Sequence, residues 1–454
     1  MYTYRREKFL NYKVALVSLG CSKNLVDSEV MLNILSSNSY KLTQDTNKAD
    51  IIIVNTCGFI ESAKQESIDN IIELGQLKNN GNCKVLIASG CLAERYKGDL
   101  INGMPELDAV IGTGDYKSIL EVIESAMSGS KVVKYGNQES IDIHELPRVI
   151  STVAASTYLK IAEGCDNRCT YCIIPSLRGK YRSRRFEDII KEAAQLAGQG
   201  IKELNVIAQD TTRYGMDLYG KYRIAELLDE LSKIEGIEWI RLQYSYPDEF
   251  DDDLINIIAT NDKVCKYLDI PIQHASNAIL KRMGRRTTKE EIKDLVTKLR
   301  GKIPNIALRT SLIVGFPGET ENDFKELVDF VKDIRFDRLG VFTYSREEDT
   351  PAFQMEEQVD DEIKLKRQER IMLLQSDISL DNNQKMVGKV IKVFIEGIES
   401  NKYYGRSYKD APEIDGNVFF SSKEKHNPGE FTYVKIVEAS EYDLIGEEMN
   451  EYSK

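Results

Sequence analysis

Three cysteines, Cys165, Cys169 and Cys172, lie in the short stretch GCDNRCTYC with the spacing C-x3-C-x2-C. Thiolates this close together usually bind metal. A structural zinc ion needs four protein ligands, and His144 and His274 lie on distant segments, so zinc is the weaker alternative. A cubane of four irons held by three cysteines has one iron free. The spacing therefore predicts a 4Fe-4S cluster whose open iron binds a substrate or cofactor.

Three further cysteines each follow a strand-like run: Cys21 ends LGC, Cys57 ends NTC and Cys91 ends SGC. Open α/β sheets bind their ligands at the carboxyl ends of parallel strands, so we expect these three thiols to meet at one rim. Cys83 instead begins a strand-like run, and we expect it to pack as a small apolar side chain. Cys265 precedes a strand-like run, and we expect it to have a structural role.

The N-terminal part of the chain alternates strand-like runs with helix-period stretches, which predicts a parallel sheet covered on both faces. We assign residues 11–127 to this domain and residues 128–150, where periodicity weakens, to a linker. The four predicted strands are 13–20, 49–56, 83–90 and 108–114.

Residues 151–381 contain six strand-like runs separated by helix-like stretches, which predicts a partial (β/α)6 barrel. In a barrel of this kind the carboxyl ends of the strands carry the chemistry. The predicted strands are 156–164, 202–210, 237–245, 266–274, 306–316 and 338–345. Besides Cys165, the polar residues at these ends are Gln209, Asp210, Tyr244, Gln273, His274 and Tyr344.

Residues 383–450 contain short β-like runs broken by Gly, Pro and Asn, which predicts a small antiparallel β-barrel. The fold class is therefore α/β: an N-terminal parallel α/β domain, a central partial (β/α)6 barrel and a small C-terminal β-barrel.

The composition is that of an ordinary globular protein, with 42% hydrophobic and 30% charged residues among 454. No apolar run is long enough to cross a bilayer, and the N-terminal stretch has no signal-peptide core, so we expect a cytoplasmic protein without membrane contact. The net charge of -12 argues against broad nonspecific binding to nucleic acid.

We call Cys21, Cys57 and Cys91 the first cysteine group and Cys165, Cys169 and Cys172 the second, in chain order. Around the second cysteine group the chain resembles the radical S-adenosylmethionine (SAM) enzymes, whose C-x3-C-x2-C signature follows the first barrel strand. The resemblance implies that Cys165, Cys169 and Cys172 bind a 4Fe-4S cluster, whose open iron chelates SAM and whose electron generates a 5'-deoxyadenosyl radical. It also implies that the turn VGFPGET contacts the adenine. The implied cofactor-binding residues are Gly315, Phe316, Pro317, Gly318 and Glu319.

The order of all three parts is similar to that of the radical SAM methylthiotransferases, which carry a cluster domain, a radical SAM barrel and a TRAM domain. This resemblance implies a second 4Fe-4S cluster on Cys21, Cys57 and Cys91, where sulfur is held and methylated by SAM. The motifs SLGCSKNLVDSE, NTCGFIESAKQES, ASGCLAERY and GRSYKDAPEIDG are most similar to the branch that modifies an aspartate of the small-subunit ribosomal protein numbered twelve. A flavodoxin or ferredoxin type electron donor and a monomeric state are expected from the same resemblance.

Two alternatives remain open at this stage. A tRNA-adenosine methylthiotransferase is expected to carry a TYGCQMN-like first motif and a basic last domain, whereas this chain has SLGCSKN and nine basic against twelve acidic residues over 383–449. A noncatalytic iron-sulfur or zinc protein is the third interpretation.

No catalytic residue can be assigned from the sequence, because no Ser-His-Asp or paired-carboxylate arrangement is evident. Asp210 and His274 could orient SAM or substrate, although a structural hydrogen-bonding role is more usual. The basic clusters RGKYRSRR (178–185) and KRMGRR (281–286) are either solvated faces or binding sites for the SAM carboxylate, the substrate aspartate or ribosomal RNA.

Overall fold

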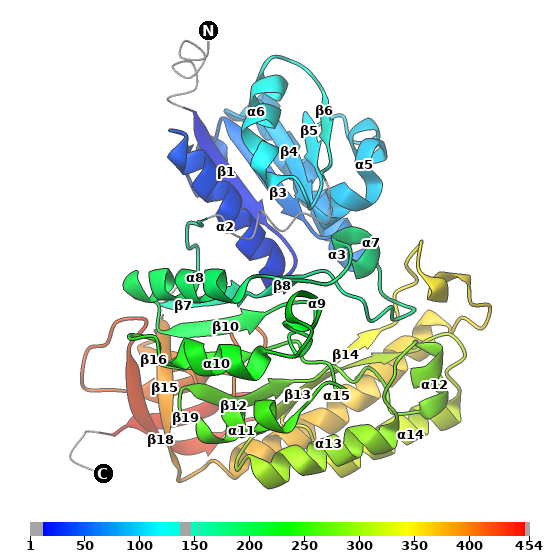
Figure 1. Ribbon diagram of the computed structural model, residues 1–454, viewed down its shortest axis with the longest axis vertical. Coiled ribbons are helices and arrows are strands. Elements are labelled where there is room, and N and C mark those ends of the chain that lie inside the picture. Colours follow the sequence, from blue (N-terminus) through cyan, green and yellow to red (C-terminus); the bar gives the residue numbers. More distant parts are fainter. Residues whose placement is uncertain (1–11, 137–146, 153, 450–454) are drawn as a thin grey trace.

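The computed structural model describes residues 12–136, 147–152 and 154–449. Some of the predictions lie outside the described residues: the N-terminal stretch 1–11, His144 of the predicted linker, and residue 450 at the end of the predicted C-terminal domain. None of the described helices is long and apolar enough to cross a membrane. In Figure 1 the N-terminal α/β domain lies above the central sheet, and the C-terminal barrel lies beside that sheet at the lower left.

The N-terminal domain is a six-stranded parallel sheet with the order β2-β1-β3-β4-β5-β6. Its four predicted strands are all present, and β3 and β4 are buried at every position, as expected for strands covered on both faces. The segment 128–150 contains one more strand of this sheet, β6. The strands are β1 (Lys13–Ser18), β2 (Lys41–Leu42), β3 (Ile51–Thr56), β4 (Val85–Gly90), β5 (Ala109–Ile111) and β6 (Val132–Lys134).

Helices on both faces of this sheet bury two apolar clusters, one on each side. One of them, α2, carries buried polar residues as well as apolar ones, and its N-terminal end points down to β7 (Figure 1). The helices are α2 (Ser22–Ser37), α3 (Glu61–Gly75), α4 (Leu77–Asn80), α5 (Cys91–Gly103) and α6 (Ile119–Met127), with short 3-10 helices η2 (Thr46–Lys48) and η3 (Tyr116–Ser118).

The central sheet has six parallel strands in sequential order, with β7 and β14 at its two edges, so it is an open arc. The predicted strand 156–164 is divided at Ile161: β7 ends at Lys160, and β8 pairs with β9 in a separate two-stranded ribbon. The strands are β7 (Ser156–Lys160), β8 (Ala162–Glu163), β9 (Arg182–Ser183), β10 (Glu203–Ile207), β11 (Trp239–Leu242), β12 (Val264–Asp269), β13 (Ala307–Val314) and β14 (Arg338–Thr343).

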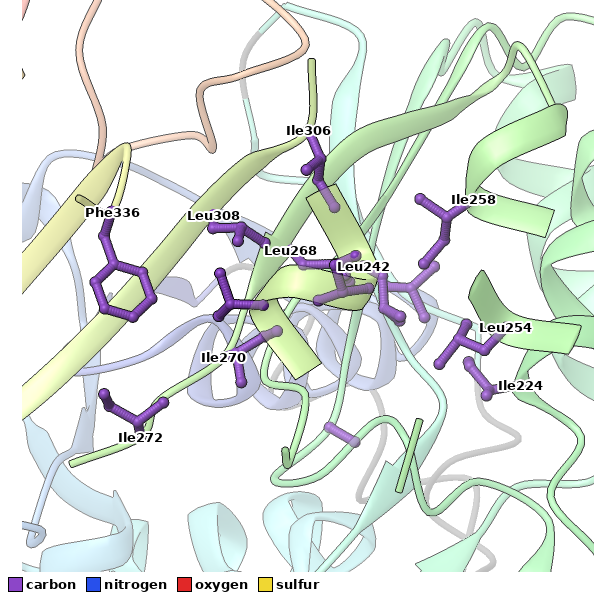
Figure 2. Close-up of a cluster of buried hydrophobic side chains, with 14 of the residues drawn as sticks. Ile224, Leu242, Leu254, Ile258, Leu268, Ile270, Ile272, Ile306, Leu308 and Phe336 are labelled. Atoms are coloured by element: carbon purple, nitrogen blue, oxygen red, sulfur yellow. The ribbon is translucent and has the colours of Figure 1, made fainter. Parts of the chain in front are cut away.

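Side chains alternate across this sheet, and the convex face packs against the helices. Figure 2 shows this apolar contact, in which Leu242 and Leu268 meet Leu254 and Ile258 of α11. The helices are α7 (Ile174–Arg178), α8 (Phe186–Gly198), α9 (Met216–Tyr219), α10 (Ile224–Ser232), α11 (Asp252–Thr260), α12 (Asn277–Arg282), α13 (Lys289–Lys302), α14 (Glu321–Ile334) and α15 (Asp361–Gln384), with the 3-10 helix η5 (Pro351–Gln354).

The concave face of the central sheet is polar. In β10 and β11, Glu203 and Arg241 alternate with the apolar residues that face the helices, and both are fully buried. Glu203 pairs with Arg241 at 3.2 Å and with Arg406 of the C-terminal barrel, and Arg241 also donates to the carbonyl of Tyr408 at 2.6 Å. The segment after Arg406 thereby closes the amino-terminal end of the arc.

The C-terminal domain is a closed five-stranded barrel with the order β15-β16-β17-β19-β18. The β-like runs of the sequence, 390–398, 403–408, 416–422 and 431–440, correspond to its first four strands in chain order, whereas β19, with the polar sequence LIGEE, was missed. Its strands are β15 (Val390–Glu399), β16 (Lys402–Arg406), β17 (Val418–Ser421), β18 (Phe431–Ala439) and β19 (Leu444–Glu448).

Candidate iron-sulfur and cofactor site

The structure brings Cys21, Cys57 and Cys91 together at the carboxyl rim of three adjacent strands. Cys21 is the N-cap of α2, Cys57 follows β3, and Cys91 is the first residue of α5. A Cβ added to Gly20 would lie 2.8 Å from the Cβ of Cys57, and one on Gly58 would lie 2.9 Å from the carbonyl oxygen of Cys91. Since Gly20 also has φ of +86°, only glycine allows this close approach.

Burial, and after it the negative charge of Cys91 and Cys21, raises the pKa of the Cys57 thiol to about 12. Burial raises the pKa of Cys91 as well, against the effect of Arg178. Thiolates at these positions therefore require positive charge close by, and metal binding supplies it while it displaces the protons. The donor set and the close approach of the loops fit an iron-sulfur cluster.

Cys165, Cys169 and Cys172 lie in a single excursion, residues 164–181, which begins and ends at the β8–β9 ribbon. Gly164 begins the excursion with φ of +79°, and a Cβ there would lie 2.1 Å from the carbonyl oxygen of Lys180. The Cys172 N–H donates to the Cys169 carbonyl at 3.0 Å, which turns the loop back on itself.

The environment of this loop also fits a cluster. Burial raises the pKa of Cys165 to about 12 and that of Cys172 still further above its usual value. Asn167, between two of the cysteines, donates to Asp210 at 2.8 Å, so this strand-end carboxylate shapes the loop. Arg285 lies with its Nη1 3.9 Å from the sulfur of Cys169.

The two cysteine groups lie on either side of one interface. Cys91 packs against Ile173 and Leu177. Ile173 follows Cys172 and is the N-cap of α7, and Leu177 lies within that helix. The Thr113 hydroxyl of the N-terminal domain donates to the carbonyl of Leu177 at 2.8 Å. The loop that carries one cysteine group is therefore packed against a cysteine of the other.

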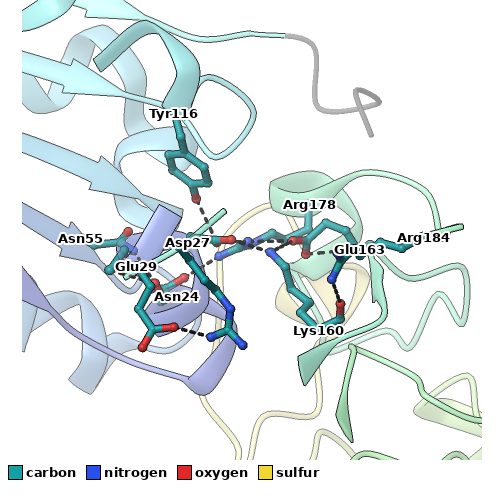
Figure 3. Close-up of polar contacts among 12 residues, drawn as sticks. Asn24, Asp27, Glu29, Asn55, Tyr116, Lys160, Glu163, Arg178 and Arg184 are labelled. Atoms are coloured by element: carbon teal, nitrogen blue, oxygen red, sulfur yellow. Dashed lines mark hydrogen bonds and ion pairs between the residues drawn. The ribbon is translucent and has the colours of Figure 1, made fainter. Parts of the chain in front are cut away.

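A buried charge cluster fixes this interface, and Figure 3 shows it. Arg178 donates to Asp27 of α2 at 2.6 Å and to Glu163 of β8 at 3.1 Å. Lys160 of β7 pairs with both carboxylates, and none of the four side chains is more than 5% exposed. We call Asp27, Lys160, Glu163 and Arg178 the interface charge cluster.

Arg178 also reaches the first cysteine group, with its Nη2 3.5 Å from the sulfur of Cys91. Through Glu163, it is linked to the strand that immediately precedes the loop of Cys165. One guanidinium therefore contacts a thiol of one group and a carboxylate two residues from the other.

A second contact holds the domains together farther along the rim. Arg95 of α5 donates to Glu347, after β14, at 2.7 Å and to the carbonyl of Gly58 at 2.9 Å. Because Gly58 follows Cys57, this arginine also supports the loop of the first cysteine group.

The structure resolves the two interpretations of the basic clusters. Arg178, Arg184 and Arg285 are each less than 9% exposed, so the solvated-face interpretation is wrong for them. Arg184 pairs with Glu192, while Arg286 lies at the surface against Asp248. The buried arginines serve the interface and the cysteine loops.

In the turn VGFPGET, side chains hold the turn itself. Glu319 accepts hydrogen bonds from the backbone N–H groups of Gly315 and Phe316 and pairs with Arg367 at 3.0 Å. The Phe316 ring is fully buried and meets Tyr344 edge-on at 5.3 Å between centroids. These side chains are engaged in the turn, so a cofactor contact here would come from its backbone and from Pro317 and Gly318.

The remaining strand-end residues are distributed around the mouth of the arc. Burial lowers the pKa of His274 to about 3, so its ring is neutral, and its Nδ1 accepts from the Ser276 N–H at 2.9 Å. Burial raises the pKa of Asp210. Gln209 donates to Glu163, and Tyr244 has φ of +59°. Cys83 and Cys265 are buried among apolar side chains, as expected.

Sequence reasoning missed the interface charge cluster. Lys160 interrupts the apolar run STYLKIAEG, and Asp27 interrupts NLVDSEV. Charges inside segments that must be buried were the available signal, because such charges are kept only where they are paired.

No group of three or more His, Cys, Asp or Glu side chains suited to a single metal ion occurs in the described part of the chain.

Three family models match the chain in the order of its three parts. Residues 13–112 match uncharacterized protein family UPF0004, residues 159–331 match the radical SAM superfamily, and residues 387–448 match the TRAM domain. The fold and the cysteine loops thus define a radical SAM protein with an N-terminal cysteine-bearing domain and a TRAM domain.

Curated relatives narrow this class. The ribosomal protein uS12 methylthiotransferase RimO of Clostridioides difficile (strain 630) is 55% identical over 440 residues, 97% of this chain and 99% of that protein. RimO of Acetivibrio thermocellus is 54% identical over 451 residues, again 97% and 99% of the two chains. The chain belongs to the RimO family of radical SAM methylthiotransferases.

Solved structures support the fold. The radical SAM methyltransferase TsrM from Kitasatospora setae, solved with cobalamin and a [4Fe-4S] cluster bound, superposes with a TM-score of 0.55 at 15% identity, over 75% of this chain and 74% of that one. At this identity the likeness extends to the fold alone.

Proposed function

We propose that this chain transfers a methylthio group to the β-carbon of an aspartate in ribosomal protein uS12, using SAM and two 4Fe-4S clusters. Cys21, Cys57 and Cys91 hold one cluster, and Cys165, Cys169 and Cys172 hold the other. The observation that carries this proposal is the position of two three-cysteine groups on either side of one buried interface, with Cys91 packed on the loop of the second group.

Radical chemistry suits such a substrate, because the hydrogens of an aspartate CH2 are too weakly acidic for a side-chain base near neutral pH. When bound, the cofactors supply a 5'-deoxyadenosyl radical and a methylthio group. The protein then has to hold both reacting partners and exclude water. The interface charge cluster does the first task by fixing α2 against β7 and β8.

Individual residues have supporting roles in this proposal. Asp210 and Gly164 shape the loop of Cys165, Cys169 and Cys172. We assign the contact with the SAM adenine to the backbone of the turn 315–319. His274, neutral and bonded to the backbone, has a structural role.

The tRNA-modifying alternative is not favoured. The curated relatives cited above are named for ribosomal protein uS12. The acidic C-terminal barrel suits a basic ribosomal protein better than a nucleic acid. We also propose a flavodoxin or ferredoxin type electron donor, a cytoplasmic location and a monomeric state.

Mass spectrometry of uS12 tests the function. Ribosomes from a strain that lacks this gene should carry uS12 without the methylthio mass on its aspartate, and the purified, anaerobically reconstituted protein should restore that mass in the presence of SAM and a reductant. An unchanged uS12 mass in the deletion strain contradicts the proposal. Methylthiolated adenosine lost from tRNA in the same strain would support the alternative.

Chemical analysis separates both enzymes from a noncatalytic carrier. The reconstituted protein should contain iron and sulfide at the level of two clusters and should cleave SAM to 5'-deoxyadenosine when reduced. A protein that binds iron without SAM cleavage would be a carrier or scaffold.

A further inference from the structure

Lys23 is a buried cation at the mouth of the central arc. It belongs to the first turn of α2, two residues after Cys21, and it is only 6% exposed. Its Nζ lies 2.8 Å from the centroid of the Tyr244 ring, at the carboxyl end of β11. The ammonium of the N-terminal domain therefore lies directly over the strand ends of the radical SAM sheet.

The two carboxylates of α2, Asp27 and Glu29, are paired with cations other than Lys23. In the interface charge cluster, two cations, Lys160 and Arg178, are matched by two carboxylates. Farther along α2, Glu29 pairs with Arg148, which also pairs with Glu192 of α8, and Glu192 pairs in turn with Arg184. Within residues 12–136, 147–152 and 154–449, no carboxylate lies within ion-pair distance of Lys23, and its ammonium lies over the Tyr244 ring instead.

A buried ammonium without a counter-charge is unfavourable, and an aromatic face compensates for only part of the lost hydration. Such a group is best explained by an anion that arrives from outside the chain. On one side of Lys23, Leu25 and Val26 of the same helix pack with Tyr158 and Ile207 of the arc, and this burial limits the screening of an ion pair by water.

We propose that Lys23 binds the carboxylate of the aspartate side chain that the enzyme modifies; this rests on the proposed function. The carbon that reacts is bonded directly to that carboxylate. An ion pair to Lys23, with the Tyr244 ring beneath it, therefore fixes the reacting carbon between the two cysteine groups. The same contact selects aspartate over neutral side chains.

A binding experiment tests this on both partners. The full-length reconstituted holoenzyme is titrated anaerobically with purified uS12 and with uS12 whose target aspartate is changed to asparagine. Wild-type enzyme should bind the aspartate form about tenfold more tightly or better, as expected for loss of a charge-assisted contact. Lys23→Met should bind the two forms equally, and Lys23→Arg should recover part of the difference.

Lys23→Met preserves the length of an unbranched side chain, and Met is the residue at this place in the TYGCQMN motif expected of the tRNA-modifying relatives. Lys84→Met is the matched control, because Lys84 is about half exposed and pairs with Asp50 away from this mouth. It should keep the wild-type preference for aspartate.

Iron content and SAM cleavage without uS12 distinguish substrate binding by Lys23 from a role in holding a cluster or SAM. Both should be unchanged in Lys23→Met. Loss of iron would show that Lys23 serves the first cysteine group, and loss of SAM cleavage at full iron content would show that it serves SAM; either result overturns the proposal. So does a Lys23→Met enzyme that still prefers aspartate. If the wild-type enzyme leaves uS12 unmodified, the proposed function itself fails, whatever Lys23 does.

Discussion

The two cysteine groups are built in opposite ways. Cys165, Cys169 and Cys172 come from one loop, closed at its base by the β8–β9 ribbon. Cys21, Cys57 and Cys91 come from three strand ends, which meet only because β1, β3 and β4 are neighbours in the sheet. The geometry of the Cys165 group is local, whereas that of the Cys21 group depends on the fold of a whole domain.

Because of this difference, we expect the two cysteine groups to be disrupted by different mutations. The local loop depends on a few short-range contacts, such as the Gly164 approach to Lys180. The strand-end group depends on sheet register and on docking, since Cys91 packs on α7 of the other domain. Mutations that loosen the interface should therefore affect the strand-end group first.

The largest effect is expected from removing one cysteine of each group. Cys165→Ala should abolish reductive SAM cleavage, whereas Cys21→Ala should retain SAM cleavage and lose methylthiolation of uS12. Each variant should lose about half of its iron, because three thiolates are needed to hold a cubane that has one open iron. Anaerobic iron analysis and 5'-deoxyadenosine assays measure both results.

Cys83→Ala is the matched control, because Cys83 is buried in the same domain away from the rim. It should keep its full iron content. Equal loss of SAM cleavage in Cys21→Ala and Cys165→Ala would show that the two groups do not have separate tasks.

The next largest effect is a difference in stability between variants of two buried arginines. Arg178 lies near Cys91 of the first cysteine group, and Arg285 lies near Cys169 of the second. Arg178→Gln leaves Asp27 and Glu163 short of a partner, and breaking a buried pair costs about 3–5 kcal/mol. Arg285→Gln removes a hydrogen bond to the Pro271 carbonyl and a stacking contact with Tyr246, which are worth about 1–3 kcal/mol. Denaturant unfolding of the holoenzyme should therefore rank Arg178→Gln as the less stable variant.

EPR spectra of the two arginine variants test whether each arginine lies near a different cluster. Arg178→Gln should alter the EPR signal of the reduced cluster near Cys91, and Arg285→Gln that of the cluster near Cys169. Asp27→Asn is the control for Arg178, because it weakens the same charge cluster without removing the contact with sulfur. An identical spectral change in both arginine variants would contradict the assignment of one arginine to each group.

The sequence predicted most of what is local in this molecule. The six candidate cysteine ligands, the main strands of both parallel sheets and the small barrel follow from spacing and periodicity. The β19 strand was missed because LIGEE is short and polar, and β6 because VVK lies in a weakly periodic stretch. The metal-binding roles themselves remain predictions.

What the sequence could not supply are the contacts between segments far apart in the chain. Asp27 and Arg178 are separated by 151 residues, and nothing in either local pattern indicates the other. In the same way, Phe316 and Glu319 were assigned to cofactor binding from their motif, although their side chains pack within the turn. Burial decides such roles, and burial is a property of the whole fold.

The smallest effect concerns one hydroxyl that bridges the two domains. Thr113 donates to the Leu177 carbonyl at 2.8 Å, and Thr113→Val should cost about 1 kcal/mol, the usual net value of a buried hydrogen bond. Thr211→Val is the control, because Thr211 makes an equivalent bond to the Gln243 carbonyl at 2.7 Å inside the central domain. Both variants should lose similar stability, but only Thr113→Val should speed hydrogen exchange in α7. If both variants leave exchange in α7 unchanged, the strand-end group does not depend on docking through this helix, and the contrast between the two groups is limited to how each is folded.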